Sequence, residues 1–352
     1  MSQKIVFTND IAATLDTIVD EAAPNRVFVI TDVNVDYFVL SRLSDCKTVA
    51  GATRIVIKSG DINKNVDSLS QVWKQLCDGG ASRKSLIINI GGGVVTDLGG
   101  FAAATFKRGV RFVNVPTTLL SAVDAAVGGK TGINFNGFKN EVGAFCEADA
   151  VIISTRFLDS LPIQEVKSGY AEMLKHGLLS SRDEVAKLLA FDFSHIDHEL
   201  LLSLLTESVE VKRRIVAEDP HEQGIRRALN LGHTVGHAFE SLALKRMSAI
   251  PHGYAVAWGT VVELVLSHMQ MQFDSVLLNA VADFVRTNYG AFAITCNDYD
   301  AIIDLMHHDK KSHNGELNFS LLSAPGDIHI DSICDAETVK AALDIYRDLM
   351  HI

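Results

Sequence analysis

Short apolar runs rich in β-branched residues recur through the first 155 residues and alternate with helical patterns. The runs cover residues 27–31, 54–58, 85–90, 111–115 and 150–153. Apolar residues are nearly continuous within each run, which is typical of parallel strands covered on both faces. Between two of these runs, residues 66–76 repeat apolar side chains at the spacing of one helical face. The alternation predicts an α/β fold whose N-terminal domain, residues 1–155, is Rossmann-like with a parallel sheet.

The pattern changes after this domain, because helical periodicity dominates the rest of the chain. Helices are predicted over residues 166–179, 200–216, 225–244, 254–271, 276–288 and 336–349, and a strand only over residues 317–322. Pro162 can begin a helix, so the boundary falls near residues 155–162. We expect residues 156–352 to form a mainly α-helical domain.

Composition excludes several classes of partner. The 352 residues include 32 Lys and Arg against 43 Asp and Glu, and the net charge of −11 argues against duplex nucleic acid or an anionic membrane. The most apolar stretch, residues 254–266, contains Glu263 and is far shorter than the ~20 residues of a spanning helix. Five cysteines without a C-x-x-C pair indicate a reducing compartment. We therefore expect a cytoplasmic protein.

Three consecutive glycines, Gly91 to Gly93, directly follow the run that ends at Ile90. Glycine lets the backbone approach a pyrophosphate, and the N-terminus of a following helix favours its negative charge. Thr96 stands where the G-x-G-x-x-G fingerprint has its last glycine. A phosphate-binding turn and an ordinary tight turn both remain open.

A second glycine-rich stretch contains Gly128, Gly129 and Lys130, followed by Lys139 and Asn140. The residue six positions before Lys130 is Asp124, so the spacing of a P-loop ATPase is absent. Lysine and asparagine beside glycine still suit an anionic ligand. An ordinary solvated loop is the alternative.

Three histidines, His233, His237 and His252, lie within 20 residues. His233 and His237 are four residues apart and share a helical face, so spacing alone favours them as a pair of metal ligands. Zinc takes histidine nitrogens and carboxylate oxygens at ~2.0–2.2 Å and keeps a position open in catalytic sites. Thr234 replaces the glutamate of H-E-x-x-H, so a zincin protease is not predicted.

Two charged clusters are ambiguous by themselves. Glu172 and Lys175 are three residues apart on a predicted helix, where a surface ion pair is the ordinary outcome. The cluster that ends in Lys310 and Lys311 is typical of a solvated surface unless it folds back onto the other motifs.

Taken together and in this order, the motifs resemble the 3-dehydroquinate synthase family of sugar phosphate cyclases. The resemblance covers nearly the whole chain, from residues 31–34 to 309–311. It is carried by residues 60–64, 91–97, 115–118, 124–130, 139–140, 171–175 and 226–237. Each segment is common in proteins, whereas the combination is highly specific.

The resemblance implies an enzyme that depends on NAD and on a divalent metal, usually Zn²⁺, with Co²⁺ as the alternative. The implied reaction converts 3-deoxy-D-arabino-heptulosonate 7-phosphate, an anionic sugar phosphate, to 3-dehydroquinate and phosphate in the shikimate pathway towards chorismate and aromatic amino acids. It combines transient oxidation by NAD, phosphate elimination, re-reduction, ring opening and an intramolecular aldol. No net oxidation occurs, so such an enzyme is a carbon–oxygen lyase.

The resemblance also implies roles for individual residues. The metal ligands would be Glu172, His233 and His252, which places His237 on the substrate side. Residues that match catalytic and anion-binding positions are Arg108, Asp124, Lys130, Asn140, Lys175, Lys212, Arg226, Asn230, His237 and one of Lys310 or Lys311. Residues that match NAD contacts are Asp32, Asn34, Asp61, Lys64, Gly93, Val94, Asp97, Thr117, Thr118, Lys130, Lys139 and Ser160. Arg108 corresponds to an arginine that the family supplies across a dimer, so a homodimer is expected.

Three residues depart from the family pattern, and three other functions compete with it. Thr96 replaces a usual glycine, Asp61 a usual glutamate and Tyr254 another glutamate. A cyclase that makes a different cyclitol is disfavoured by Arg226-x-x-x-Asn230 with His237. An alcohol dehydrogenase related to glycerol dehydrogenase would need no phosphate pocket. A non-enzymatic nucleotide-binding module would not need so dense a set of histidines, acids and lysines.

Overall fold

The computed structural model describes residues 3–307 and 317–352, and the chain divides into two compact units. The first unit comprises Met1–Pro162 and His198–Val209, and the second comprises Ile163–Asp197 and Glu210–Ile352. The helix α8 (His198–Glu218) therefore contributes to both units. The boundary expected near residue 155 stays a sequence-based prediction.

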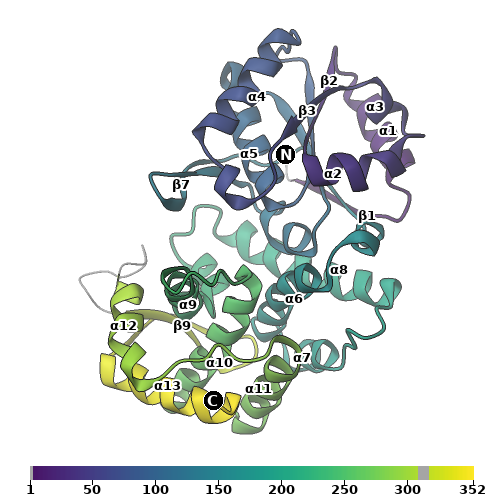
Figure 1. The fold of residues 1–352 in the computed structure, drawn as a ribbon. Coiled ribbons are helices and arrows are strands. Elements are labelled where there is room, and N and C mark those ends of the chain that lie inside the picture. The colour runs from purple at the N-terminus through teal and green to yellow at the C-terminus, as the bar shows by residue number, and fades with distance from the viewer. Residues whose placement is uncertain (1–2, 308–316) are drawn as a thin grey trace. The chain divides into compact units, whose positions relative to one another are not determined.

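A six-stranded parallel sheet forms the centre of the first unit (Figure 1). Its strands lie in the order β1 (Lys4–Phe7), β8 (Ala150–Ile153), β5 (Arg111–Pro116), β4 (Leu86–Gly91), β2 (Val27–Asp32) and β3 (Thr53–Ile57). The five predicted runs are all strands of this sheet, which confirms the α/β prediction. β1 was not predicted, because this strand has only four residues and lies at the edge of the sheet, where it pairs with β8.

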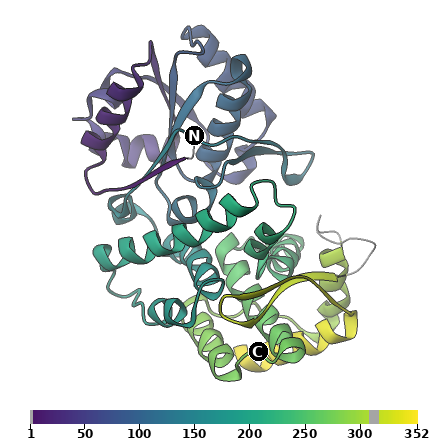
Figure 2. The same ribbon diagram turned by 180° about the vertical axis from the view of Figure 1, so that it is seen from behind.

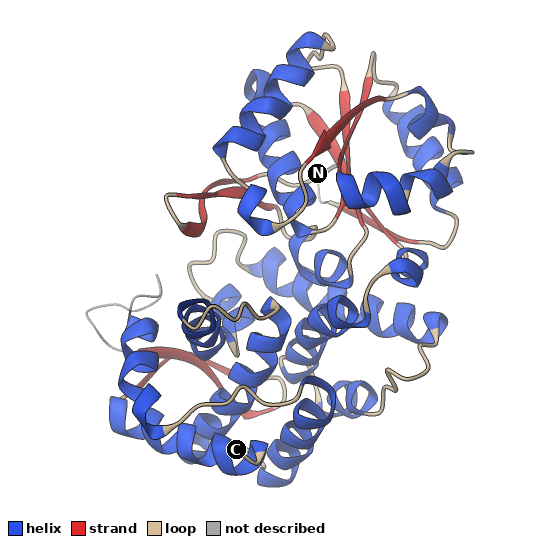
Figure 3. Ribbon diagram, viewed as in Figure 1, coloured by secondary structure: helices blue, strands red, loops and turns tan. Residues whose placement is uncertain are grey.

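Helices cover both faces of this sheet, as Figure 3 shows with the strands in red. Alternate side chains such as Val29, Ile88 and Val113 pack in one core with α1 (Ile11–Ala22), α2 (Val33–Phe38), η1 (Leu40–Leu43) and α3 (Lys47–Gly51). The helices α4 (Val66–Asp78) and α5 (Gly93–Thr105) contact β3 and β4. Short turns complete the unit: η2 (Asp61–Asn63), η3 (Phe106–Arg108) and η5 (Thr155–Ser160).

The glycine-rich stretch 124–140, interpreted as a possible loop, instead forms a π-helical turn and a hairpin. The turn is η4 (Ser121–Ala125), and the hairpin pairs β6 (Lys130–Phe135) with β7 (Phe138–Phe145). Asn136 and Gly137 join the strands with φ values of +51° and +84°. Asn-Gly is a strong signal for such two-residue hairpin turns, so the loop interpretation overlooked a sequence feature that predicts this hairpin.

The second unit is mainly helical and is organised around α10 (His252–Met271). This helix contacts α6 (Ile163–Leu178), α9 (His233–Lys245), α11 (Ser275–Tyr289), α13 (Ala336–Met350) and β9 (Leu317–Ala324). It is apolar nearly all round, as expected of a helix enclosed by others. Across residues 3–307 and 317–352, no helix combines the length and the apolar character that crossing a membrane requires.

Three details of this unit correct the prediction. The helix expected over residues 225–244 is interrupted: η6 (Ile225–Asn230) ends before α9, because Gly232 adopts a φ of +79°. The strand β10 (Asp327–Cys334) pairs with β9, so the strand over residues 317–322 has a partner (Figure 2). The helices α7 (Arg182–Leu189) and α12 (Tyr299–His307) and the turn η7 (Cys296–Asp298) were also not predicted.

Candidate active site

Three side chains from three helices converge in the second unit. Glu172 lies on α6 and is fully buried, whereas His233 and His252 are the first residues of α9 and α10. Nε2 of each histidine lies 3.5 Å from Oε1 of Glu172. Residues 61 and 80 positions apart in the sequence thus present their donor atoms to one point.

The other ring nitrogen of each histidine is held by an acceptor. Nδ1 of His233 lies 3.1 Å from the carbonyl oxygen of Leu231, and Nδ1 of His252 lies 3.1 Å from Oε2 of Glu240. Because a carbonyl or a carboxylate can only accept, each Nδ1 must carry the proton in these hydrogen bonds. In a neutral ring this leaves the Nε2 lone pair directed at Glu172, the usual arrangement around a metal-binding histidine.

A divalent metal fits this cluster. Neither carboxylate oxygen of Glu172 has a hydrogen bond of good geometry within the part of the chain that the structure describes. Ligand bonds of ~2.0–2.1 Å in a tetrahedron place donor atoms about 3.3 Å apart, close to the 3.5 Å between each Nε2 and Oε1. Two imidazoles and a carboxylate also match the zinc donor set that leaves one position open.

The electrostatics of the cluster are set by its burial and its charges. Burial alone would raise the pKa of Glu172, but the charges of Lys175 and His233 hold that pKa well below its usual value. Burial lowers the pKa of His252, whereas the nearby carboxylates of Glu172 and Glu240 outweigh that effect and raise the pKa to about 9. Glu172 is therefore ionised at neutral pH, as a metal ligand must be. A bound divalent ion would displace the proton from Nε2 of His252.

Lys175 forms an ion pair with Glu172, and both side chains are buried. The alternative of a solvated surface pair is therefore wrong for these two residues. The positive charge of Lys175 at ion-pair distance favours the ionised form of the Glu172 carboxylate.

His237 lies in the same cluster. Its ring centroid is 5.4 Å from that of His233 and 5.8 Å from that of His252, and ligand atoms of the three rings lie within 4.8 Å of one another. The structure thus brings together the pair suggested by spacing and the set implied by the family resemblance. Which of them bind metal stays a prediction.

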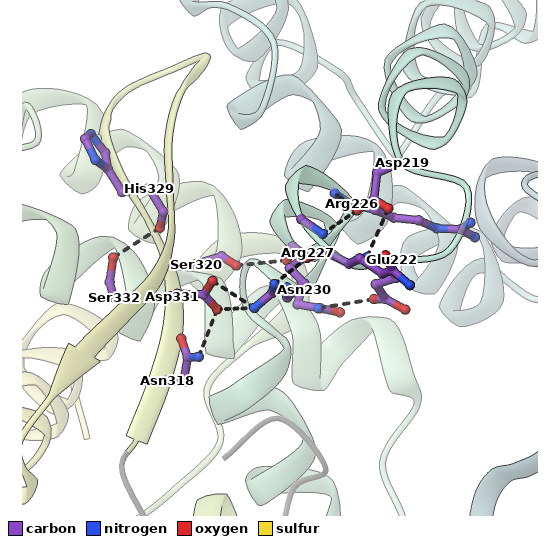
Figure 4. Close-up of polar contacts among 12 residues, drawn as sticks. Asp219, Glu222, Arg226, Arg227, Asn230, Asn318, Ser320, His329, Asp331 and Ser332 are labelled. Carbon is purple, nitrogen blue, oxygen red and sulfur yellow. Dashed lines mark hydrogen bonds and ion pairs between the residues drawn. The ribbon is translucent and has the colours of Figure 1, made fainter. Parts of the chain in front are cut away.

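The turn that carries Arg226 and Asn230 is organised by Asp219 (Figure 4). Its carboxylate accepts from the backbone N–H groups of Gln223 at 3.0 Å, Gly224 at 2.7 Å and Arg226 at 3.1 Å. These hydrogen bonds hold the pKa of Asp219 below its usual value. Arg226 is buried, and its guanidinium donates to the carbonyl of Pro220 at 2.6 Å.

The neighbouring Arg227 ties the same turn to the β9–β10 hairpin (Figure 4). Its guanidinium donates to both oxygens of Asp331, at 2.6 and 2.8 Å, and its carbonyl accepts from Ser320 Oγ at 2.9 Å. Asp331 has a φ of +57° and lies at a register shift between the strands. Such a bulge re-aims a side chain, and here Asp331 meets Arg227.

In the first unit, several predicted residues form one polar network. Lys64 Nζ donates to Asp97 at 2.9 Å and to Asn140 at 2.6 Å, and lies 3.8 Å from Asp61. Asn134 donates to Asp61 at 3.1 Å and accepts from the Asn140 backbone at 3.0 Å. Asn134 was not among the predicted site residues, although it lies between Lys130 and Asn140 in the glycine-rich stretch.

The glycine-rich turn has the strand–turn–helix form that the motif predicts. β4 ends at Gly91, and α5 begins at Gly93 without a side-chain cap at Gly92. A Cβ atom at Gly91 would lie 2.5 Å from Val95 side-chain atoms, so this turn requires glycine. Thr96 is buried, and its hydroxyl lies 3.3 Å from both the Gly93 carbonyl and Ser121 Oγ, so the departure from glycine is accommodated.

The remaining predicted residues are distributed over several elements and turns. Asp32 caps α2 by accepting from the N–H groups of Asn34 and Val35. Lys212 is buried on α8, and Arg108 is exposed in η3 with a φ of +65°. Val94 lies in α5, Thr117 and Thr118 follow β5, Asp124 lies in η4, Lys130 and Lys139 lie on β6 and β7, and Ser160 ends η5. Lys310 and Lys311 lie outside the described residues.

We predict that Asp219→Ala loosens the Arg226 turn, because three backbone N–H groups lose their acceptor. Amide hydrogen exchange of residues 223–226, followed by mass spectrometry, should become at least about fivefold faster. Asp192→Ala is the matched control, because Asp192 also accepts local hydrogen bonds, from Ser194, in another loop. Unchanged exchange at residues 223–226 in Asp219→Ala would show that the carboxylate does not organise the turn.

Comparisons with known proteins give one consistent family. The family model described as 3-dehydroquinate synthase N-terminal matches residues 54–168, and the C-terminal model of the same family matches residues 169–312. A 3-dehydroquinate synthase from Parabacteroides distasonis is 47% identical over 346 residues, 98% of each chain. One from Thermococcus kodakarensis is 37% identical over 95% of this chain and 93% of its own.

Solved structures extend the likeness at the level of the fold. A 2-epi-5-epi-valiolone synthase from Streptomyces hygroscopicus, solved with NAD⁺ and Zn²⁺ bound, is 23% identical with a TM-score of 0.87, covering 99% of this chain and 97% of its own. A glycerol dehydrogenase from Schizosaccharomyces pombe is 15% identical with a TM-score of 0.67, covering 99% and 90%. The family models and the curated relatives place the chain more narrowly than this shared fold: it belongs to the 3-dehydroquinate synthase family.

Proposed function

We propose that the protein converts 3-deoxy-D-arabino-heptulosonate 7-phosphate to 3-dehydroquinate and phosphate, as a lyase of the shikimate pathway. The observation that carries the proposal is the convergence of His233 and His252 on the buried Glu172, in a chain 47% identical to a 3-dehydroquinate synthase. The five cysteines are free thiols, which supports a cytoplasmic location.

Glu172, His233 and His252 would hold one Zn²⁺ or Co²⁺ ion. When bound, the ion supplies Lewis-acid polarisation of substrate hydroxyl groups. Glu240 and the Leu231 carbonyl would keep the two imidazole rings oriented for that role, through the hydrogen bonds at each Nδ1. His237, beside these rings, would hold or move a proton on the substrate side.

NAD would supply reversible hydride transfer, so that the substrate is oxidised and reduced again within one turnover. The first turn of α5, which begins with Gly93 and Val94, would receive the pyrophosphate, because helix N-terminal N–H groups favour anions. Asp97 lies one turn further along α5, where it accepts from Lys64. The network of Lys64, Asp61 and Asn140 would orient the cofactor.

The anionic substrate would be held by basic and amide side chains. Lys175, Lys212 and Arg226 are buried, and Asn230 lies on the same turn as Arg226. Buried guanidinium and ammonium groups bind phosphate and carboxylate strongly, and they supply local positive potential in a chain of net charge −11. A simple alcohol dehydrogenase has no need of such a set, which supports the cyclase over the dehydrogenase.

Phosphate release without net NADH production is the expected outcome with the heptulosonate phosphate, zinc and catalytic NAD. The cofactor is recycled in the proposed reaction, so absorbance of reduced nicotinamide should stay flat while phosphate accumulates. A deuterium label at carbon 5 should be retained in the product. If NADH forms in proportion to product, the protein is a dehydrogenase rather than a lyase. If it does not react with this substrate but reacts with another sugar phosphate, a different sugar phosphate cyclase is favoured.

Metal analysis should separate the two histidine assignments. His252→Ala is expected to weaken zinc binding more than about 100-fold. Loss of a hydrogen-bond partner of a metal ligand weakens metal binding about 10–100-fold, and loss of the ligand itself should weaken it more. His237→Ala should keep zinc and lose turnover. If His237→Ala instead loses zinc as His233→Ala does, the pair suggested by spacing is the correct one.

We also propose a homodimer in which Arg108 reaches the partner's site. Arg108 and Lys107 are exposed and both have positive φ, a strained conformation that presents the side chain from η3. In the same unit, Phe135 and Phe138 are cross-strand partners beside the turn of the β6–β7 hairpin, and they expose 50% and 61% of their surface. An exposed apolar pair of this kind suits burial against a second copy.

Mixed dimers test this arrangement. Lys212→Ala and Arg108→Ala chains are each expected to be inactive, and co-expressed chains should recover activity, because a hybrid contains one site with both residues intact. Lys107→Ala serves as the matched control and should stay active alone. Absence of recovery in a purified heterodimer would contradict the shared site.

A further inference from the structure

The buried carboxylate of Glu263 has no part in the proposed reaction. It is fully buried on α10, where the residues from Ala255 to Val262 are otherwise apolar or small apart from Thr260. In the sequence, Glu263 is the charge that interrupts the most apolar stretch of the chain. Burying a carboxylate is costly unless hydrogen bonds compensate, so its partners indicate its purpose.

Those partners are the first backbone groups of α9. Oε2 of Glu263 accepts from the N–H of Gly232 at 2.6 Å, and Oε1 accepts from the N–H of Val235 at 3.3 Å. Gly232 is the N-cap of α9 and has no side chain to cap the helix, and Val235 is the third helical residue. A capping box uses two side chains of the helix itself to satisfy these two positions. Here one carboxylate from another helix satisfies both.

The packing of the two helices explains why Glu263 can reach this end. A Cβ atom at Gly259 would lie 2.6 Å from the backbone nitrogen of Gly236, so only glycine lets α10 come this close to α9. Glu263 follows Gly259 by four residues and therefore shares its helical face. The close crossing at Gly259 thus places the carboxylate over the first turn of α9, where the helix dipole favours a negative charge.

We propose that Glu263 is a positioning residue for the metal site, acting through the backbone around His233. The two N–H groups that it binds flank His233 in the sequence, and the Leu231 carbonyl that orients the His233 ring precedes Gly232 directly. Releasing this turn would let Nε2 of His233 move away from Glu172. The inference rests on the proposed zinc site.

The test is zinc affinity of the purified protein, measured by competition with a chromogenic chelator. Glu263→Ala should weaken zinc binding about 10–100-fold, the range for outer-shell partners of metal ligands. Glu263→Gln keeps the shape and one acceptor oxygen, and should weaken it by a smaller factor of about 3–10. The visible spectrum of the Co²⁺-substituted protein should change in both variants, because it reports the coordination geometry.

Ser267→Ala is the matched control. Ser267 is also buried on α10, and its hydroxyl donates to the backbone carbonyl of Glu263 and accepts from the Leu322 N–H. This change therefore disturbs the same part of α10 without removing the Glu263 carboxylate. It should lower the unfolding midpoint while leaving zinc affinity and the cobalt spectrum unchanged, which separates positioning from general loss of stability.

Two outcomes would overturn different claims. If His233→Ala loses zinc but folded Glu263→Gln and Glu263→Ala bind it with wild-type affinity, Glu263 does not position the site. If His233→Ala itself retains zinc, the zinc site is wrongly assigned. Should Glu263→Ala fail to fold, the Gln variant decides: wild-type affinity and spectrum refute the inference, and weakened binding with a changed spectrum supports it.

Discussion

The carboxylate of Glu172 is the charge on which the candidate site depends. It is fully buried on α6, and such a charge is tolerated only where partners compensate for the lost hydration. Lys175, one turn away, provides that compensation, and so do the imidazoles of His233 and His252 while Nε2 carries a proton. Once those protons leave, the Nε2 lone pairs and the carboxylate meet at one point, which makes a cation-binding site.

Helix starts give this site its geometry. His233 and His252 are each the first residue of a helix, where the backbone has not yet closed its hydrogen bonds. The Leu231 carbonyl, just before α9, holds the His233 ring, and Glu240 of α9 holds the His252 ring. Glu263 of α10 holds the first turn of α9. The ring positions are therefore set by the turn before α9 and by contacts between α9 and α10.

The turn before α9 is also held by acceptors from outside it, the carboxylates of Asp219 and Asp331. Asp219 gathers three backbone N–H groups, and Asp331 holds Arg227 from the hairpin. Neither residue is among those proposed to touch substrate. Together, Asp219 and Asp331 hold the turn on which Arg226 is buried, one through its backbone N–H groups and the other through Arg227.

The sequence by itself predicted the parallel sheet, the glycine turn before α5 and the three histidines as site residues. These features depend on periodicity and on residues that are close together in the sequence. It missed the break at Gly232, since apolar spacing continues across η6 and α9 while a positive φ leaves no periodic signal. It also suggested a surface pair at Glu172 and Lys175. Only the tertiary structure buried that pair and brought Glu240, Glu263 and Asp331 to their partners. Contacts between elements depend on how helices and strands pack, and spacing along one chain segment carries no record of that packing.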